Sequence, residues 1–228
     1  MIGLPHVHHR TIDSTNARAR ELAAAGAPHG TLVTADEQTA GRGRQGRAWV
    51  AAPGDALLAS VVVREVEPVL PLAAAVAAAE ACDALADVHA QIKWPNDVWI
   101  DRRKAAGILL EGRPQEGWAV IGIGLNVRTR EFRGELAGVA TSLALNGADA
   151  PVADVLVELV SRLDGWIGAP ADEVLAAWTE RDALAGEPVR WDGGSGVAAG
   201  VDESGALVVD RDDGSRVALD AGEVHLLR

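Results

Sequence analysis

The sequence contains few sulfur atoms and an unusual set of aromatic side chains. Its 228 residues include one cysteine, one methionine, one phenylalanine and no tyrosine, although there are seven tryptophans. A single cysteine excludes a disulfide within the chain and indicates a reducing compartment, which we expect to be the cytoplasm. In its alanine-rich surroundings, Cys82 is predicted to be a small buried apolar residue rather than a nucleophile.

Long apolar runs are also missing. The alanine-rich segment 70–85 is interrupted by Glu80 and Asp83, and the N-terminal MIGLPHVHHR lacks the apolar core of a signal peptide. We therefore expect no membrane partner. The three histidines of the N-terminal stretch have no acidic or cysteine partner at metal-ligand spacing, so we interpret it as a polar terminal segment without a metal site.

Positive charge is scarce over the chain as a whole. Lys and Arg number 21 against 33 Asp and Glu, which gives a formal net charge of −12. A surface of this sign repels polyanions, so we predict no nucleic-acid partner. With 48% apolar and 24% charged residues, the composition is that of a globular protein with a substantial core.

One loop concentrates arginine and glycine against this acidic background. Residues 41–47 read GRGRQGR, so a backbone with little steric restriction carries three guanidinium groups. Such a loop can fold around a phosphate or carboxylate, with bare N–H groups and paired arginine donors facing the anion. A solvated basic turn and an arm that contacts nucleic acid are the alternatives.

Hydrophobic patterning predicts an α+β protein. The expected strands are 31–35, 57–63, 91–94, 98–101, 105–112 and 118–127, and the expected helices are 17–26, 72–86, 152–166 and 172–184. The turns between successive strands are too short for helical crossovers, so the strands must pair largely antiparallel. Five short strands after Gly186 predict a small β-barrel, which divides the chain into domains 1–185 and 186–228.

Four polar or glycine-rich segments stand in a recognisable order. They are Ser14-Thr15-Asn16, the loop from Gln38 to Trp49, KWPND (93–97) followed by Lys104-Ala-Ala-Gly107, and GIGLN (122–126). In this order and at these separations they resemble the catalytic domain of the biotin protein ligases, over roughly residues 12–127. That family's architecture is a mixed, largely antiparallel sheet flanked by helices, related to the class II synthetases, with a C-terminal SH3-like β-barrel.

The resemblance implies a two-step reaction. The carboxylate of biotin attacks the α-phosphorus of ATP in the presence of Mg²⁺, which gives biotinyl-5′-AMP and pyrophosphate. A lysine of the biotin carboxyl carrier protein or domain of acetyl-CoA carboxylase, or of a related carboxylase, then attacks the mixed anhydride. Attack of one anion on another requires preorganised cations, which the arginine loop and two lysines can supply.

The resemblance also implies which residues form the site. The catalytic residues are expected to be Lys104, Arg42 and Asp97. Biotin is expected to contact Ser14, Thr15, Asn16, Gln38, Gly41, Arg42, Gly43, Arg44, Lys104 and Gly107. ATP or the adenylate is expected to contact Arg42, Arg44, Trp49, Lys93 and Asn126.

Several of these residues also have a purely structural interpretation. The cluster 14–16 can cap the helix that follows it, and Lys104 can be a solvated charge at the start of a strand. Gly107 can mark a bulge, Asp97 can complete a turn, and Trp49 can pack in the core. Arg47 can pair with a carboxylate and hold the loop closed.

Two other functions compete with the ligase interpretation. Lipoate ligases and octanoyl transferases share the KxxG element, but they are not expected to carry GRGRxGR and KWPND. A regulator without catalysis is the second alternative, because some family members carry an N-terminal DNA-binding domain. Only eleven residues precede Ile12 here, so we expect a ligase without operator binding, as a monomer or weak homodimer. Arg228 resembles a place where the family can supply an ATP-contacting arginine, but we do not assign it to the site.

Overall fold

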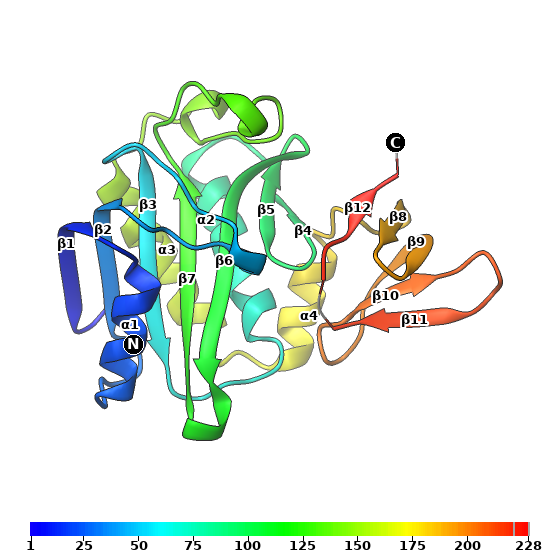
Figure 1. Cartoon of the computed structure of the whole chain (residues 1–228), viewed down its shortest axis with the longest axis horizontal. Coiled ribbons are helices and arrows are strands. Elements are labelled where there is room, and N and C mark those ends of the chain that lie inside the picture. Colours follow the sequence, from blue (N-terminus) through cyan, green and yellow to red (C-terminus); the bar gives the residue numbers. More distant parts are fainter. Residues whose placement is uncertain (221, 228) are drawn as a thin grey trace.

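The computed structural model describes residues 1–220 and 222–227, which form two β-sheets and the helices around them (Figure 1). The large sheet contains β1 (His6–Ile12), β2 (Leu32–Gln38), β3 (Ala56–Val63), β4 (Gln91–Lys93), β5 (Asp97–Ile100), β6 (Arg103–Arg113) and β7 (Trp118–Asn126). Its strand order is β1-β2-β3-β7-β6-β5-β4. β1 pairs in parallel with β2 and the other neighbours pair antiparallel, which confirms the prediction of a mixed, largely antiparallel sheet.

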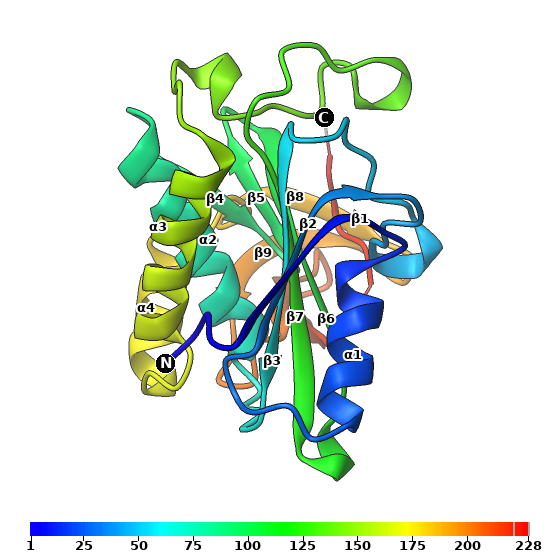
Figure 2. The same ribbon diagram turned by 90° about the vertical axis from the view of Figure 1, so that its left-hand side faces the viewer.

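Helices cover both faces of the large sheet (Figure 2). One face carries α1 (Thr15–Ala24), and the other carries α2 (Leu70–Leu85), α3 (Val152–Trp166) and α4 (Ala171–Thr179). Short 3₁₀ turns occupy Arg44–Gly46, Pro114–Glu116, Gly134–Leu136 and Ala144–Asn146. No helix in the described residues is both long and apolar enough to cross a membrane.

The main core lies between the sheet and α2. The alanines of this helix from Ala73 to Ala81 are at most 2% exposed, because their small side chains let it approach the strands closely. Cys82 on the same helix is fully buried, as predicted, and burial is the main cause that raises its thiol pKa to about 12. The thiol therefore stays protonated at neutral pH, which excludes a nucleophilic role.

The C-terminal part is a five-stranded antiparallel sheet within the described residues. Its strands are β8 (Pro188–Trp191), β9 (Gly194–Val201), β10 (Leu207–Asp210), β11 (Arg216–Leu219) and β12 (His225–Leu226), in the order β11-β10-β9-β8-β12. It packs beside the main body, where Trp94 Nε1 donates to the carbonyl of Gly205 at 3.1 Å. The division at 185/186 stays a prediction.

Two elements differ from the sequence-based expectation. The histidine-rich N-terminus is not a polar tail: it forms β1, and His6 Nε2 and His8 Nδ1 lie 2.8 and 3.0 Å from Thr34 Oγ1 on β2. The predicted helix 172–184 was wrong at its C-terminal end, because α4 ends at Thr179. The following segment instead pairs with Ile92 of β4, which accepts from Ala183 N and donates to Arg181 O, and so covers the sheet edge.

Candidate active site

Three glycines leave one area of the large sheet bare on the face that carries α1. Gly107 of β6 pairs with Gly124 of β7, and Gly122 lies two residues before Gly124, so all three face the same side. A Cβ at Gly122 would lie 2.0 Å from Asn16 Oδ1, and a Cβ at Gly124 would lie 2.4 Å from Trp49 Cε2. Glycine is therefore required here, because side chains from other segments lie directly on the backbone. We call these three residues the glycine floor.

The first turn of α1 forms one wall beside the glycine floor. Ser14 caps the helix, and its hydroxyl accepts from Ala17 N at 3.4 Å. Gln38, at the end of β2, uses its side-chain oxygen to accept from Thr15 N at 2.7 Å, and the same oxygen lies 3.1 Å from Thr15 Oγ1. Capping of α1 by Ser14 and contact of Thr15 with Gln38 thus occur together.

Asn16 joins this wall to the sheet. Its Oδ1 lies 2.6 Å from Ser60 Oγ on β3, and its Nδ2 donates to Glu111 Oε2 on β6 at 2.9 Å. Ser60 Oγ also lies 2.8 Å from Thr15 Oγ1. Thr15, Asn16 and Ser60 are at most 5% exposed, so they form a buried polar network from Gln38 to Glu111.

The arginine loop crosses in front of β7 and β6 (Figure 1). It closes on itself through Gly43 N to Arg47 O at 2.7 Å and Trp49 N to Gly41 O at 3.0 Å. The indole of Trp49 lies against Gly107 and Gly124, and its Nε1 is buried with no hydrogen-bond partner in the part of the chain that the structure describes. Trp49 thus covers the glycine floor rather than packing in the main core.

The three loop arginines have different surroundings. Arg42 approaches Glu111 at 3.9 Å. Arg44 donates to Asn96 Oδ1 at 3.2 Å and to the carbonyl of Gly222 at 3.3 Å, and burial is the main cause that lowers its pKa. Arg47 contacts the carboxylate of Glu223, the kind of partner that the sequence suggested for it. The loop is therefore attached at two points to the connection between β11 and β12.

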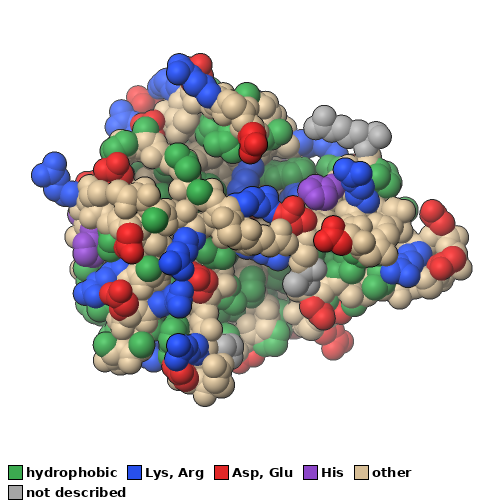
Figure 3. All heavy atoms as spheres, viewed as in Figure 1, with side chains coloured by type: hydrophobic (Ala, Val, Ile, Leu, Met, Phe, Trp, Pro, Cys, Tyr) green, Lys and Arg blue, Asp and Glu red, His purple; other side chains and the backbone are tan. Residues whose placement is uncertain are grey.

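Two lysines lie at the β4–β5–β6 side of the site. Lys104 Nζ is 2.6 Å from Asp97 Oδ1, 5.7 Å from the centroid of the Trp49 ring and 3.1 Å from the position of a Cβ on Gly107. Lys93 pairs with Asp97 across β4 and β5, and burial is the main cause that lowers its pKa. Basic side chains gather at the centre of this face, where the main body meets the C-terminal sheet (Figure 3).

Asn126 shows a different role in the structure. Its Nδ2 donates to the carbonyl of Thr141 at 2.9 Å, and the residue is 6% exposed. Asn126 thereby holds the segment after β7, and this contact uses one of the two N–H groups of its side-chain amide. Arg228 lies outside the described residues.

Sequence reasoning missed part of the site. Ser60 and Glu111 were not assigned, although both bond to Asn16, and Gly122 and Gly124 were read only as part of a motif. Alternation was the available signal for the glycines, since residues two apart on a strand share a face. No local signal marks Ser60 or Glu111, because their partner is distant in the chain.

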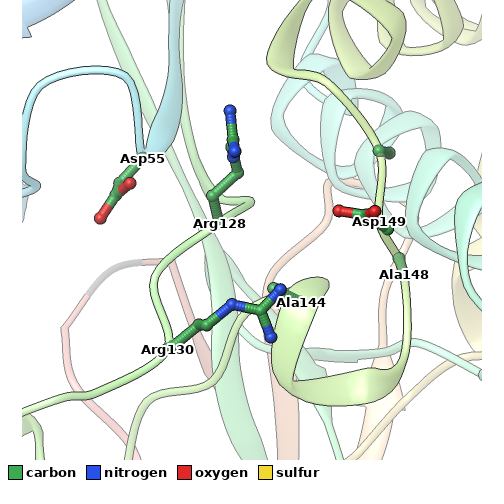
Figure 4. A pocket seen from close by; sticks show the side chains of 7 residues that line it. Asp55, Arg128, Arg130, Ala144, Ala148 and Asp149 are labelled. Atoms are coloured by element: carbon green, nitrogen blue, oxygen red, sulfur yellow. The ribbon is translucent and has the colours of Figure 1, made fainter.

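Two hollows lie away from the glycine floor. One, of about 250 Å³, lies where β3 begins and β7 ends, and none of the predicted site residues line it (Figure 4); its lining is Asp55, Arg128, Arg130, Ala144, Ala148, Asp149 and Ala150. The other, of about 280 Å³, lies between the main body and the C-terminal sheet. Its lining includes Arg44, Leu72, Trp94, Asn96 and Gly205. Arg44 is the only predicted site residue on either lining, so the hollows do not coincide with the assembled site.

Comparisons with known proteins place this architecture in a family. Residues 8–127 match the model of the biotin/lipoate A/B protein ligase family, and residues 186–227 match the biotin protein ligase C-terminal domain. The biotin–[acetyl-CoA-carboxylase] ligase of Mycobacterium tuberculosis is 37% identical over 235 residues, which cover 94% of this chain and 86% of that protein. The bifunctional ligase/repressor BirA of Bacillus spizizenii is 41% identical over 154 residues, or 63% of this chain, and the match spans about half (47%) of its length.

A solved structure agrees with this result. The biotin protein ligase of Aquifex aeolicus in complex with biotin and ATP superposes with a TM-score of 0.86 at 28% identity, covering 99% of this chain and 100% of that one. The family model covers more than half of the chain, and the fold extends over nearly all of it. The chain therefore belongs to the biotin/lipoate A/B protein ligase family and carries the C-terminal domain of the biotin protein ligases.

Proposed function

We propose that this protein is an ATP-dependent biotin protein ligase, which forms biotinyl-5′-AMP and transfers biotin to a lysine of a biotin carboxyl carrier protein or domain. The observation that carries the proposal is the arrangement of Lys104, Asp97 and the arginine loop around the glycine floor. A buried polar network lies at one end of this floor and cations lie at the other. That arrangement suits a ligand with a polar ring and an anionic tail.

The cations provide the chemistry of the first step. Two anions, the carboxylate of biotin and the α-phosphate of ATP, must approach each other, so positive charge must be in place beforehand. Lys104 is held by Asp97 on the rigid β5–β6 pair, so its ammonium group is positioned before ligands arrive. Arg42 comes from the loop, and we assign it to charge that develops on the phosphate oxygens.

The second role of the arginine loop is to exclude water from the site. A mixed anhydride hydrolyses if water reaches it, so the adenylate must be covered until the acceptor lysine arrives. The loop and Trp49 already lie across the glycine floor. The indole N–H of Trp49 has no partner among residues 1–220 and 222–227, so it is a donor that a bound ligand can use. The roles of Ser14, Thr15, Asn16 and Gln38 toward the ureido ring, and of Lys93 toward phosphate, belong to this proposal. Asn126 would contact the nucleotide through its side-chain oxygen or through the N–H that does not bond to Thr141.

The metal requirement stays a prediction. The described side chains include no group of three or more His, Cys, Asp or Glu that could hold an ion. The residues therefore offer no dedicated cage, and Mg²⁺ would be bound mainly by the phosphates of ATP.

The first experiment is biotin-dependent exchange of labelled pyrophosphate into ATP. We expect exchange with biotin and none with lipoate, the substrate of the other branch of the family. Lys104→Ala should slow exchange at least tenfold while the protein keeps its far-UV circular dichroism and melting temperature. Arg103→Ala, the neighbouring cation on β6, is the matched control and should retain activity.

The possible results separate the alternatives. Exchange that lipoate supports equally well would assign the protein to the lipoate branch. A folded protein that binds biotin without exchange would be a sensor, and the ligase proposal would fail. Incubation with ATP, biotin and a carrier domain then tests transfer, and a duplex-binding assay tests the predicted absence of DNA binding.

A further inference from the structure

Among the described residues, Glu111 is the one carboxylate that contacts both the first turn of α1 and the arginine loop. It lies on β6, four residues after Gly107, and its side chain is 24% exposed. Oε2 accepts from Asn16 Nδ2 at 2.9 Å, and Oε1 lies 3.1 Å from Arg20 and 3.9 Å from Arg42. The sequence motifs assign it no role.

The charge of Glu111 determines which way the amide of Asn16 is turned. Asn16 Nδ2 faces Glu111 Oε2 at 2.9 Å and the carbonyl of Leu109 at 3.4 Å, and both of these groups only accept hydrogen bonds. The opposite orientation would place the amide oxygen against a carboxylate and a carbonyl. Oδ1 is therefore held toward Ser60, 2.6 Å away.

This orientation determines the hydroxyl protons that follow. Asn16 Oδ1 only accepts, so it takes the single hydroxyl proton of Ser60. In the 2.8 Å contact between Ser60 and Thr15, Thr15 must then donate. Gln38 Oε1, which accepts from Thr15 N at 2.7 Å, lies 3.1 Å from the same hydroxyl.

The network is consequently one proton short. The hydroxyl protons of Thr15 and Ser60 must serve three oxygen–oxygen contacts, and they are used between Thr15 and Ser60 and between Ser60 and Asn16. No proton is left for the contact between Thr15 Oγ1 and Gln38 Oε1, so the Thr15 oxygen has lone pairs that accept no hydrogen bond within the network. A ligand N–H would provide that donor. The ureido ring of biotin carries two such groups, whereas a dithiolane ring carries none.

We propose that Glu111 is a positioning residue for biotin: its carboxylate sets the direction of the hydrogen bonds through Asn16 and Ser60, and so presents Thr15 as an acceptor to a ring N–H of the ligand. This inference rests on the proposed function. Glu111→Gln removes the charge and adds an N–H₂ group that can donate to Asn16. The side-chain amide of Asn16 can then rotate so that its oxygen faces residue 111 and its N–H₂ group faces Ser60. The direction of the hydrogen bonds from Asn16 through Ser60 to Thr15 reverses as a result.

Calorimetric titration of the full chain with biotin tests the proposal. Glu111→Gln should weaken biotin binding at least tenfold, because a charge-assisted hydrogen bond is lost. The KM for ATP in pyrophosphate exchange should change less than threefold. Glu111→Asp keeps the charge and should bind biotin at least threefold more tightly than Glu111→Gln. Arg20→Ala removes only the exposed ion pair and should stay within threefold of the parent.

A double-mutant cycle separates positioning from general support of the fold. If Glu111 acts through Asn16, Glu111→Gln should cost less than twofold in a background that already carries Asn16→Ala. Full additivity would overturn the proposal, as would unchanged biotin affinity in a folded Glu111→Gln protein. Calorimetry measures biotin binding independently of pyrophosphate exchange. A parent protein that binds biotin but does not form the adenylate would therefore contradict the ligase function, and the test of Glu111 would still apply. A parent that does not bind biotin overturns both.

Discussion

At the scale of single residues, the site depends on the absence of side chains as much as on their presence. A methyl group at Gly122 would occupy the space of Asn16 Oδ1, 2.0 Å away. Gly122→Ala must therefore displace Asn16 and break its contacts with Ser60 and Glu111. Buried polar groups left unsatisfied cost about 1–3 kcal/mol each, so we expect at least tenfold weaker biotin binding and a lower melting temperature. Calorimetry and thermal unfolding measure the two effects.

Gly165→Ala is the matched control for this substitution. Gly165 lies in α3, and a Cβ there would meet nothing within 4 Å. The same added methyl group should leave biotin binding unchanged and raise stability by roughly 0.5–1 kcal/mol, because alanine is the better helix former. Equal losses of binding in the two variants would contradict the role of the glycine floor.

At the scale of elements, the edge strand β1 makes stability depend on pH. Burial, and then the charge of His8, lower the pKa of His6 below its ordinary value. The unfolded chain therefore binds a proton more readily, so the free energy of unfolding should fall as pH drops from about 7.5 to 5.5. The contribution should be less than about 1 kcal/mol because the side chain is exposed. His6→Gln should flatten this part of the pH profile in urea titrations.

His89→Gln is the control for the histidine substitution. His89 is exposed and makes no side-chain hydrogen bond among residues 1–220 and 222–227. Its replacement should leave the slope of stability against pH as it is in the parent. If both variants have the parent's slope, His6 does not contribute.

At the scale of the whole molecule, the connection between β11 and β12 in the C-terminal part holds the arginine loop. Arg47 contacts Glu223, and Arg44 donates to the carbonyl of Gly222. Removing the carboxylate with Glu223→Ala should release the loop, so limited trypsin digestion should cut at its arginines at least threefold faster. Mass spectrometry locates the cuts. Glu203 is an exposed carboxylate in the turn between β9 and β10, with no ion pair among the described residues, so Glu203→Ala should be cut at the parent's rate.

Much of the fold could be predicted from local patterns. Short turns such as the predicted turn 95–97 cannot hold a helical crossover, so β4 to β7 had to pair antiparallel, and they do. β1 was missed because HVHHRTI is too polar to show the alternation of a half-buried strand. The end of α4 was predicted too late in the chain. The residues after Thr179, which were expected to continue the helix, instead pair with the edge strand β4 at Ile92.

The site was predictable where its residues lie in recognisable motifs. Lys104 and Asp97 are seven positions apart on adjacent strands and meet at 2.6 Å. Glu111 and Asn16 are 95 positions apart, and no local feature of either segment specifies their contact. Only the register of β3, β7 and β6 beneath α1 brings them together.

The sequence by itself determined the α+β class, the presence of a glycine–arginine loop and the acidic net charge, because these follow from local spacing and composition. The tertiary structure decided where Trp49 lies, which carboxylate faces Asn16 and which segment holds the loop. The physical reason is that such contacts depend on how distant segments are aligned. A side chain finds its partner only after strand pairing has placed both on one face.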